Sequence, residues 1–307
     1  MSPTVARTTD RPVTVAELKR AWRALQSDSP HEQTYAAGPA PAAPWRPPRG
    51  QVITVLGCGG GVGASTTALA LAEATDARCR LIECAPPAAS GLAGASTAEL
   101  GDTGGGWRRG TRDHVLIDRT SHGALTPGDL PIPPESDLNL SIVDVARPAE
   151  AVLATDCWLR EVLVSGEPLL LVATATMPGL RRLETTLATL ADHRDVSSAV
   201  IAVLGPRLGR WPGPVRHSTG PRTNALEETR RLVAIPCDRR LAVTGPDTAP
   251  LPASVVAAAT TALDLLPAIN PTTVAPSSAR KGSPRHDQPD DHRHHHDLPR
   301  RVGSLAH

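Results

Sequence analysis

The stretch that decides the fold is "VITVLGCGGGVGASTTALALAEA", residues 52–74. It begins as an apolar run typical of a buried β-strand, passes through five glycines between positions 57 and 63, and continues as an alanine- and leucine-rich helix. Glycines at this density are costly to order in a simple connector. They do let backbone N–H groups approach an anion closely at the N-terminus of a helix. The stretch therefore predicts a phosphate-binding loop at residues 58–66.

Length and composition set the outer limits of this interpretation. The chain has 307 residues, enough for one large domain with tails, and only 2% aromatic residues, so its core must consist of Ala, Val, Leu and Ile. A net charge of +1 gives no reason to expect the protein to wrap nucleic acid. The five cysteines are scattered without a CxxC pair, which is typical of a reducing compartment. With no signal peptide and no membrane-length apolar run, we expect a cytoplasmic protein.

Seven apolar, β-rich runs alternate with helix-forming segments between residues 50 and 267. This alternation predicts an α/β fold with a doubly wound, mostly parallel sheet of about seven strands and helices on both faces. The segment 95–110, which contains "GDTGGGWRRG", is predicted to be a flexible loop over the site, anchored by Trp107. The seven runs are residues 52–57, 79–84, 114–118, 138–145, 168–176, 197–205 and 231–236.

Two flanking segments differ in composition from this central domain of residues 50–267. Residues 1–49 contain a short amphipathic helix at 14–26, opened by a Thr14–Glu17 capping box, and then a proline-rich linker. That helix either docks on the domain or binds a protein partner. Residues 268–307 lack the apolar content to fold and are predicted to be disordered. Their histidine-rich run could bind a transition metal opportunistically, but no second set of ligands indicates a preformed site.

A dinucleotide-binding fingerprint is one alternative for the glycine loop. Gly57 and Gly59 would begin it, and Glu83 ends the next strand where an acid would meet the ribose of NAD. The third glycine of that fingerprint is Val62 here, which weakens the match.

The loop "GGGVGAST", residues 59–66, resembles that of the ParA/MinD family of P-loop ATPases, which reads K-G-G-x-G-K-[ST]-T. The nearest branch is typified by the CpaE/TadZ pilus-localisation proteins, whose loops also lack the lysine. The similarity covers about residues 51–267 and includes "VAIPCDRRLAVTGPDTAPLP" (233–252), which is similar to a segment that lines the base pocket in the family. The resemblance implies a P-loop NTPase-like fold that binds ATP or ADP with Mg²⁺.

The resemblance also assigns roles to individual residues. Ser65 falls where a hydroxyl binds Mg²⁺, and Asp144 matches an aspartate that reaches Mg²⁺ through water. Asp118 also ends a predicted strand and is the rival for this role, although the strand and helix that follow Asp144 favour Asp144. The residues assigned to the nucleotide are Gly59, Gly60, Gly61, Val62, Gly63, Ala64, Ser65, Thr66, Pro236 and Asp238.

Three departures from the family pattern bear on catalysis. Ala64 replaces the lysine that neutralises phosphate charge, and Gly59 replaces the signature lysine that reaches the partner's nucleotide in a dimer. Ala85 replaces the aspartate that would orient the attacking water. Loss of one such stabiliser commonly costs about 10²- to 10³-fold in rate. We therefore expect weak or no ATP hydrolysis, unless a substitute cation such as Arg119, Arg147, Arg181 or Arg239 lies over the phosphates.

The resulting hypothesis is a nucleotide-binding positioning or scaffold factor for localisation, segregation, or secretion and pilus assembly. Besides the NAD-binding protein, one alternative is an active ATPase with a rewired site. Another is a DNA-associating module that uses arginines of the C-terminal half. Because Gly59 removes the lysine that contacts the partner's nucleotide, a homodimer and a monomer both stay open. The arginines considered for DNA are Arg181, Arg182, Arg207, Arg210, Arg216, Arg222, Arg230 and Arg231.

Overall fold

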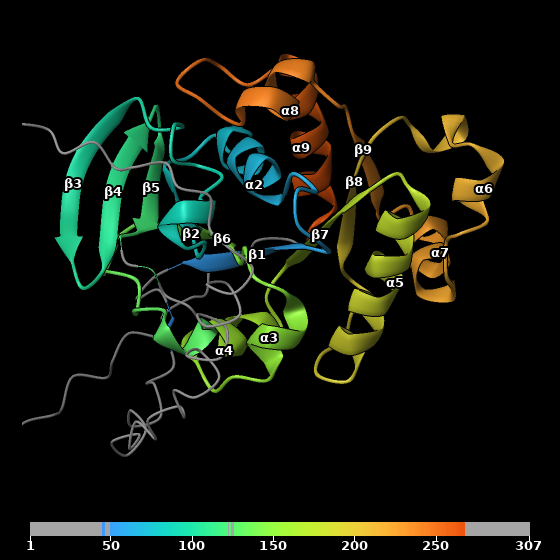
Figure 1. Cartoon of the computed structure of the whole chain (residues 1–307), viewed down its shortest axis with the longest axis horizontal. Helices are drawn as coiled ribbons and strands as arrows, with labels where there is room; N and C mark the ends of the chain where they lie inside the picture. Colours follow the sequence, from blue (N-terminus) through green and yellow to red (C-terminus); the bar gives the residue numbers. More distant parts are fainter. Residues whose placement is uncertain (1–44, 47–49, 122, 124–125, 268–307) are drawn as a thin grey trace, which may run out of the picture. The chain divides into compact units, whose positions relative to one another are not determined.

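The fold is built on one nine-stranded sheet (Figure 1). The structure, a computed structural model, describes residues 45–46, 50–121, 123 and 126–267, so the predicted helix 14–26 and the tail 268–307 lie outside the described residues. The strands are β1 (Gln51–Gly57), β2 (Cys79–Glu83), β3 (Ala98–Gly104), β4 (Trp107–Arg112), β5 (Val115–Thr120), β6 (Leu140–Asp144), β7 (Leu169–Thr174), β8 (Val200–Leu204) and β9 (Leu232–Ile235).

The strands follow the order β3-β4-β5-β2-β6-β1-β7-β8-β9. From β5 to β9 all neighbouring strands are parallel, and β1, which leads into the glycine loop, pairs with β6 on one side and β7 on the other. The predicted α/β fold with a mostly parallel sheet is confirmed. All seven predicted strands are present. β1 is an inner strand, and the glycine loop follows its carboxyl end, the end of a parallel sheet at which ligands bind in open α/β folds.

The remaining two strands correct the prediction of a flexible loop at residues 95–110. β3 and β4 form an antiparallel hairpin that extends the sheet from β5. The hairpin could not be recognised from the sequence, because β3 is almost wholly exposed and therefore has no alternation of apolar and polar residues. Trp107 is fully buried, and its indole N–H donates to the carbonyl oxygen of Ile132 at 3.0 Å. It therefore anchors the segment, as predicted, but as part of a strand.

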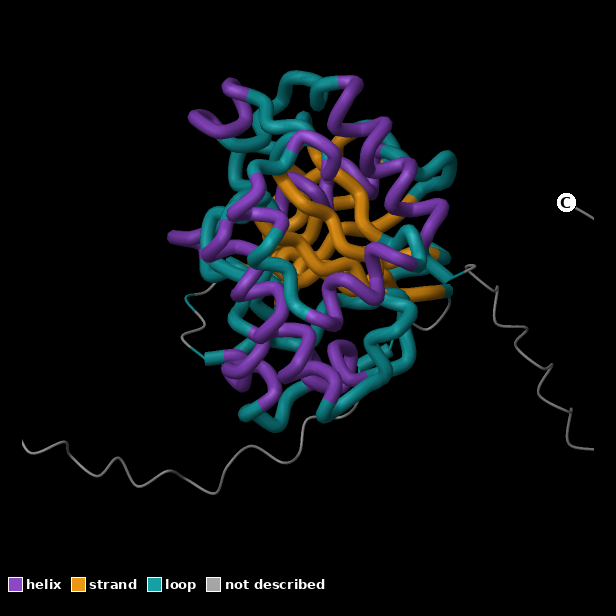
Figure 2. The backbone as a smooth tube through the Cα atoms, turned by 90° about the vertical axis from the view of Figure 1, so that its right-hand side faces the viewer, coloured by secondary structure: helices purple, strands orange, loops and turns teal. Residues whose placement is uncertain are grey.

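Helices cover both faces of the sheet (Figures 1 and 2). α2 and α9 pack on one face and contact each other, whereas α3, α4, α5 and α7 cover the other face. The helices are α2 (Ala64–Glu73), α3 (Ala149–Leu153), α4 (Trp158–Val164), α5 (Met177–Ala191), α6 (Gly213–Arg216), α7 (Pro221–Glu228), α8 (Arg239–Thr244) and α9 (Ala253–Leu265).

Each face of the sheet has its own hydrophobic cluster. Along β1, Ile53 and Val55 join the cluster under α2 and α9, whereas Val52 and Leu56 join the cluster under α3, α4 and α5. Successive side chains of a strand point to opposite faces, so a strand covered on both sides is apolar along most of its length. This is why the strand run ending in the glycine loop could be recognised from sequence.

The proline-rich linker contributes a residue to the core. Trp45 is only 7% exposed and packs edge-on against Trp158 of α4, with ring centroids 5.2 Å apart and an interplanar angle of 66°. This geometry is one that aromatic pairs favour. Trp45, which lies before the predicted domain boundary near residue 49, therefore attaches the end of the linker to the domain.

Trp45→Ala is expected to lower the free energy of unfolding by about 3 kcal/mol, because it removes a large buried side chain and leaves a cavity beside Trp158. Urea unfolding of the full chain, followed by far-ultraviolet circular dichroism, measures this change. Arg46→Ala is the matched control: Arg46 is exposed and lies 3.7 Å from Glu167, so its loss should cost less than about 1 kcal/mol. Equal stabilities for both variants would contradict burial of Trp45.

All five cysteines are free thiols, and four of them are buried. In the ranges that the structure describes, no helix combines the length and the apolar character needed to span a bilayer.

Candidate functional site

The glycine loop joins the end of β1 to the start of α2. Gly61 and Gly63 have φ values of +71° and +83°, a conformation that favours glycine, and Gly63 is the N-cap of α2. No side chain caps this helix, and its first internal hydrogen bond runs from the Thr67 N–H to the Gly63 carbonyl oxygen at 2.9 Å. The preceding N–H groups of the first turn have no partner within the helix and carry the positive end of its dipole.

A cavity of about 790 Å³ opens in front of this loop. Its size lies in the range of small-molecule and cofactor sites. A Cβ placed on Gly60 or Gly61 would meet no atom within 4 Å, so the loop presents bare backbone to the cavity. The other walls are residues 146–150 after β6, the middle of α5, Ala89, Gly91, and Gly245 with Pro246.

Two buried carboxyl groups meet behind the loop. Glu83 ends β2, Asp144 ends β6, and the two residues lie opposite each other in the parallel register. Both are fully buried. The pKa of Asp144 is raised to about 7, mainly by burial and then by the charge of Glu83, while the Ser65 hydroxyl and the Ala146 N–H oppose the shift. The structure therefore brings together Ser65 and Asp144, which the resemblance paired as Mg²⁺ residues.

Asp144 has unmet hydrogen-bonding capacity. Neither of its carboxylate oxygens has a hydrogen bond of standard geometry, although the Ser65 hydroxyl and the Ala146 N–H lie close enough to affect its pKa. A buried carboxylate in this condition is costly unless a cation or a proton compensates it. Hydroxyl and carboxylate oxygens are the ligands that Mg²⁺ prefers, directly or through water. The residues present therefore fit Mg²⁺ held together with a nucleotide.

Glu83 has a role that the sequence analysis missed. Its Oε1 accepts hydrogen bonds from the backbone N–H groups of Gly91 at 2.6 Å and Leu92 at 3.1 Å, and its Oε2 accepts from the Ser90 hydroxyl at 2.5 Å. Burial raises its pKa, and these hydrogen bonds lower it. Glu83 is thus fully buried and bonded to residues 90–92, so its carboxylate is not available to the ribose of a dinucleotide. Its position at a strand end was visible in the sequence, but its partners were not.

Asp118, the rival of Asp144, lies in a different environment. β5 continues to Thr120, so Asp118 does not end its strand as the sequence suggested. Its carboxylate binds Arg80 at 2.5 Å and Arg109 at 2.7 and 3.0 Å, from β2 and β4 respectively. Asp118 therefore joins three neighbouring strands through its two arginines, whereas Asp144 lies beside Ser65 of the loop.

Among the proposed substitute cations, Arg147 and Arg181 line the loop cavity. Arg119 instead binds Glu99 and the carbonyl oxygen of Ala93. Arg239 begins α8 and is not among the lining residues. Two of the four proposed arginines, Arg147 and Arg181, therefore lie where they could approach a phosphate bound at the loop.

Arg182 of α5 is a cation that the sequence analysis did not connect with the loop. A Cβ placed on Gly59 would lie 3.2 Å from Arg182 Nη1 and 3.4 Å from its Cδ, so the guanidinium packs directly on the loop backbone. Gly59 is the position where the resemblance places the signature lysine. Within the described part of the chain, no carboxylate lies within salt-bridge distance of Arg182.

Other residues assigned from the resemblance lie elsewhere. Pro236 lines a second cavity, and Asp238 caps α8 by accepting a hydrogen bond from the Leu241 N–H at 2.9 Å. Neither lines the loop cavity, so their assignment to a nucleotide stays a prediction. Gly245 and Pro246, from the same resembling segment, do line it.

The arginines considered for DNA lie in two cavities and in several local contacts. Arg181 and Arg182 line the loop cavity, whereas Arg207, Arg210 and Arg230 line the second cavity. The remaining ones are engaged locally: Arg216 with the Leu208 carbonyl, Arg222 with Glu184, and Arg231 with the carbonyls of Ser198 and Leu265.

Comparison with known proteins adds solved structures but no sequence match. No family model matches the chain, and no curated protein matches its sequence. A ParA family ATPase from Chlorobium tepidum is 16% identical, with a TM-score of 0.46, over 69% of this chain and 98% of that one. The cell division ATPase MinD of Pyrococcus furiosus is 15% identical, with a TM-score of 0.41, over 70% of this chain and 98% of that one.

A third similar structure is a plasmid partition protein of Borrelia burgdorferi bound to AMPPNP, which is 11% identical with a TM-score of 0.41. It covers 71% of this chain and 98% of its own. At such identities and TM-scores, the fold assignment rests on the chain's own strand order and glycine loop. That fold is α/β, with a mostly parallel sheet and a glycine loop between β1 and α2.

Proposed function

We propose that this chain binds ATP or ADP with Mg²⁺ at the glycine loop. One observation carries the proposal. The uncapped N–H groups at the start of α2 lie at the same place as Ser65, and Ser65 lies beside Asp144, whose buried carboxylate lacks hydrogen-bond partners. The loop amides and the α2 dipole bind the phosphates, and Ser65 with Asp144 holds the cation. An anion and a cation at this place satisfy groups that are otherwise costly to bury.

Hydrolysis is slow or absent in this proposal. Phosphoryl transfer depends on positioning and on charge stabilisation, and the loop itself carries no lysine. At the position of the water-orienting aspartate stands Ala85, which is buried and 3% exposed. The chain then acts as a positioning or scaffold factor in localisation, segregation, or secretion and pilus assembly. Its nucleotide would serve as a structural ligand.

The position of Arg182 supports a second candidate, an active ATPase with a rewired site. Its guanidinium lies on the loop at Gly59 and could neutralise phosphate charge from outside the loop. Phosphate release from Mg-ATP separates the two candidates. Turnover above about 1 per minute that is lost in Asp144→Ala would favour the active enzyme, since active enzymes typically run far faster than this.

The experiment that tests nucleotide binding is a fluorescence titration of the full chain with labelled ATP, ADP and NAD, with and without Mg²⁺. We expect ATP and ADP to bind more tightly with Mg²⁺, because Asp144 lies beside Ser65, which lines the cavity in front of the loop. Tight, Mg²⁺-independent NAD binding would instead support the dinucleotide fingerprint, and no binding of any of the three would contradict the proposal.

Arg182→Ala is expected to weaken ATP binding about tenfold, because it removes a charge-assisted contact with the phosphates. Arg182→Lys should retain part of the affinity, since a lysine keeps the charge but not the planar geometry. The same titration measures both, with Arg108→Ala as control because Arg108 lies on the β3–β4 hairpin and does not line the cavity. An unchanged ATP affinity in Arg182→Ala would mean that this guanidinium does not contact the phosphates.

A further inference from the structure

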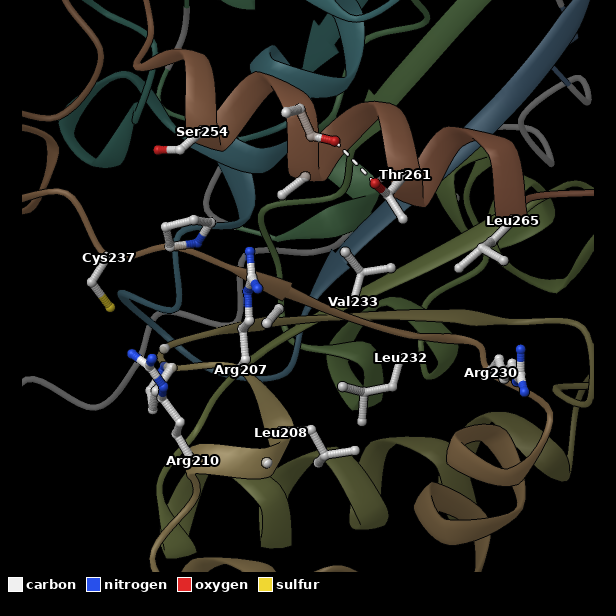
Figure 3. A pocket seen from close by; sticks show the side chains of 17 residues that line it. Arg207, Leu208, Arg210, Arg230, Leu232, Val233, Cys237, Ser254, Thr261 and Leu265 are labelled. Atoms are coloured by element: carbon white, nitrogen blue, oxygen red, sulfur yellow. Dashed lines mark hydrogen bonds between the residues drawn. The ribbon is translucent and has the colours of Figure 1, made fainter.

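A second cavity, of about 1510 Å³, follows the free edge of β9 (Figure 3). β9 is the last strand of the sheet and pairs only with β8. One wall of the cavity comes from the outer side of α9, including Ser254, Ala257 and Thr261, and the other from the turn 205–210 that follows β8. We call this cavity the β9 groove.

The backbone of β9 offers hydrogen-bonding groups to the groove. The carbonyl oxygens of Arg231 and Ile235 accept hydrogen bonds from β8, from the N–H groups of Ile201 at 2.7 Å and Gly205 at 2.9 Å. In a strand, alternate residues direct their N–H and C=O groups to opposite sides. The groups of Leu232 and Ala234 therefore point away from β8, and no hydrogen bond from another described residue reaches them. An open strand edge of this kind is a template for an added strand.

The side chains of the β9 groove are apolar in the middle and basic at both ends. In Figure 3, Arg207 and Arg210 lie toward the end of the groove at Cys237, and Arg230 lies at the other end. Leu208 and Leu232 lie between them. No Asp or Glu is among the lining residues. All three arginines are exposed, and none pairs with a carboxylate of the described residues.

We propose that the β9 groove binds an extended segment of a partner protein that has an apolar centre and carboxylates at both ends. The segment pairs with the edge of β9 as an additional strand, and its carboxylates meet Arg207 and Arg210 at one end and Arg230 at the other. Backbone pairing supplies affinity in this mode of recognition, and the charged ends select the partner.

The charge of the groove favours this partner over a second copy of the chain and over a nucleic acid. A second copy of the chain would bring its own Arg207, Arg210 and Arg230 to the interface, and like charges at close range oppose such pairing. A nucleic acid would pair with the arginines but offers no strand-like backbone to Leu232 and Ala234. An acidic, extended peptide matches both the arginines and the edge.

The experiment measures binding of a fluorescein-labelled peptide to the full chain by polarisation. The probe has alternating valine and threonine in its centre and glutamates at both ends. We expect it to bind, and we expect two matched peptides to lose binding: one with lysines in place of the glutamates, and one N-methylated along the backbone edge that would pair with β9. Salt should weaken binding of the glutamate peptide.

Charge reversal in the protein provides the matched variant. The double variant Arg207→Glu, Arg210→Glu should bind the glutamate peptide about tenfold more weakly, because two exposed ion pairs become repulsive. Arg108→Glu, at the opposite end of the sheet, should bind it as the unmodified chain does. Folding of the variants is checked by circular dichroism.

Three outcomes would overturn this proposal. The first is equal binding of the lysine and glutamate peptides, or of the double variant and the unmodified chain. The second is self-association of the chain in sedimentation that competes with the peptide and is lost in the double variant. The third is binding of a DNA duplex at the groove in place of the peptide. Nucleotide titration of the double variant stays normal in every case, so failure here is distinct from failure of the proposed nucleotide site.

Discussion

Asp118→Ala is expected to lower the free energy of unfolding by about 3–5 kcal/mol. The reason is its partner Arg80, which is only 1% exposed and binds Asp118 at 2.5 Å. Burial lowers the pKa of Arg80, and the charge of Asp118 opposes that shift. Without the carboxylate, a buried guanidinium in the middle of the sheet has no counter-charge, whereas Arg109 is partly exposed and can turn to water.

Urea unfolding of the full chain measures this loss. The double variant Arg80→Met, Asp118→Leu is the control, because replacing a buried ion pair by apolar side chains of similar volume commonly restores stability. The nucleotide affinity of the folded Asp118 variant should match that of the unmodified chain, since Arg80 and Arg109 already occupy the Asp118 carboxylate. A selective loss of nucleotide binding with unchanged stability would show that Asp118 belongs to the site after all.

Asp144→Asn is expected to have the opposite effect on stability: at neutral pH and without metal it stabilises the protein. Folding raises the pKa of Asp144 from 3.8 to about 7, so the folded state binds this proton more tightly than the unfolded state does. The favourable effect of the bound proton is fully present below about pH 4 and is lost as the pH rises to about 7. At neutral pH the ionised Asp144 therefore costs on the order of a few kcal/mol.

Thermal unfolding between pH 4 and pH 8 in metal-free buffer measures this difference. The Tm of Asp144→Asn should exceed that of the unmodified chain by about 2–4 °C per kcal/mol at pH 8, and the two should converge near pH 4. Asp118→Asn is the matched substitution at the rival aspartate and should lower the Tm at every pH in this range. A Tm difference for Asp144→Asn that does not change with pH would contradict the assigned titration.

The same variant tests the site. Asp144→Asn should lose the Mg²⁺-dependent part of ATP affinity while keeping the part due to the loop amides, because only the former depends on the carboxylate. If Asp144→Asn is more stable but its ATP affinity keeps the same dependence on Mg²⁺, the Asp144 carboxylate does not take part in Mg²⁺ binding.

The parts of the fold that could be predicted are those in which local chemistry and burial agree. β1 and β7 are covered on both faces and are almost continuously apolar, and the glycine loop follows β1 before an alanine-rich helix. The β3–β4 hairpin could not be predicted, because its outer strand is exposed at the edge of the sheet and carries no apolar pattern.

The site shows the same division. Ser65, Asp144 and the loop glycines were visible because each is a local feature at the end of a strand or the start of a helix. The contact of Arg182 with Gly59 joins residues far apart in the chain, and so do the hydrogen bonds that hold Glu83 and the ion pairs that occupy Asp118. Long-range contacts of this kind have no periodicity in the sequence.

The amino-acid sequence alone determined that the chain builds a parallel sheet with a bare glycine turn before a helix, because backbone conformation and apolar periodicity are local properties. Only the tertiary structure decided which of the two candidate aspartates is paired by arginines and which is buried beside Ser65. The physical reason is that the energy of a buried charge depends on its neighbours in space, and the strand order β5-β2-β6-β1 chooses those neighbours.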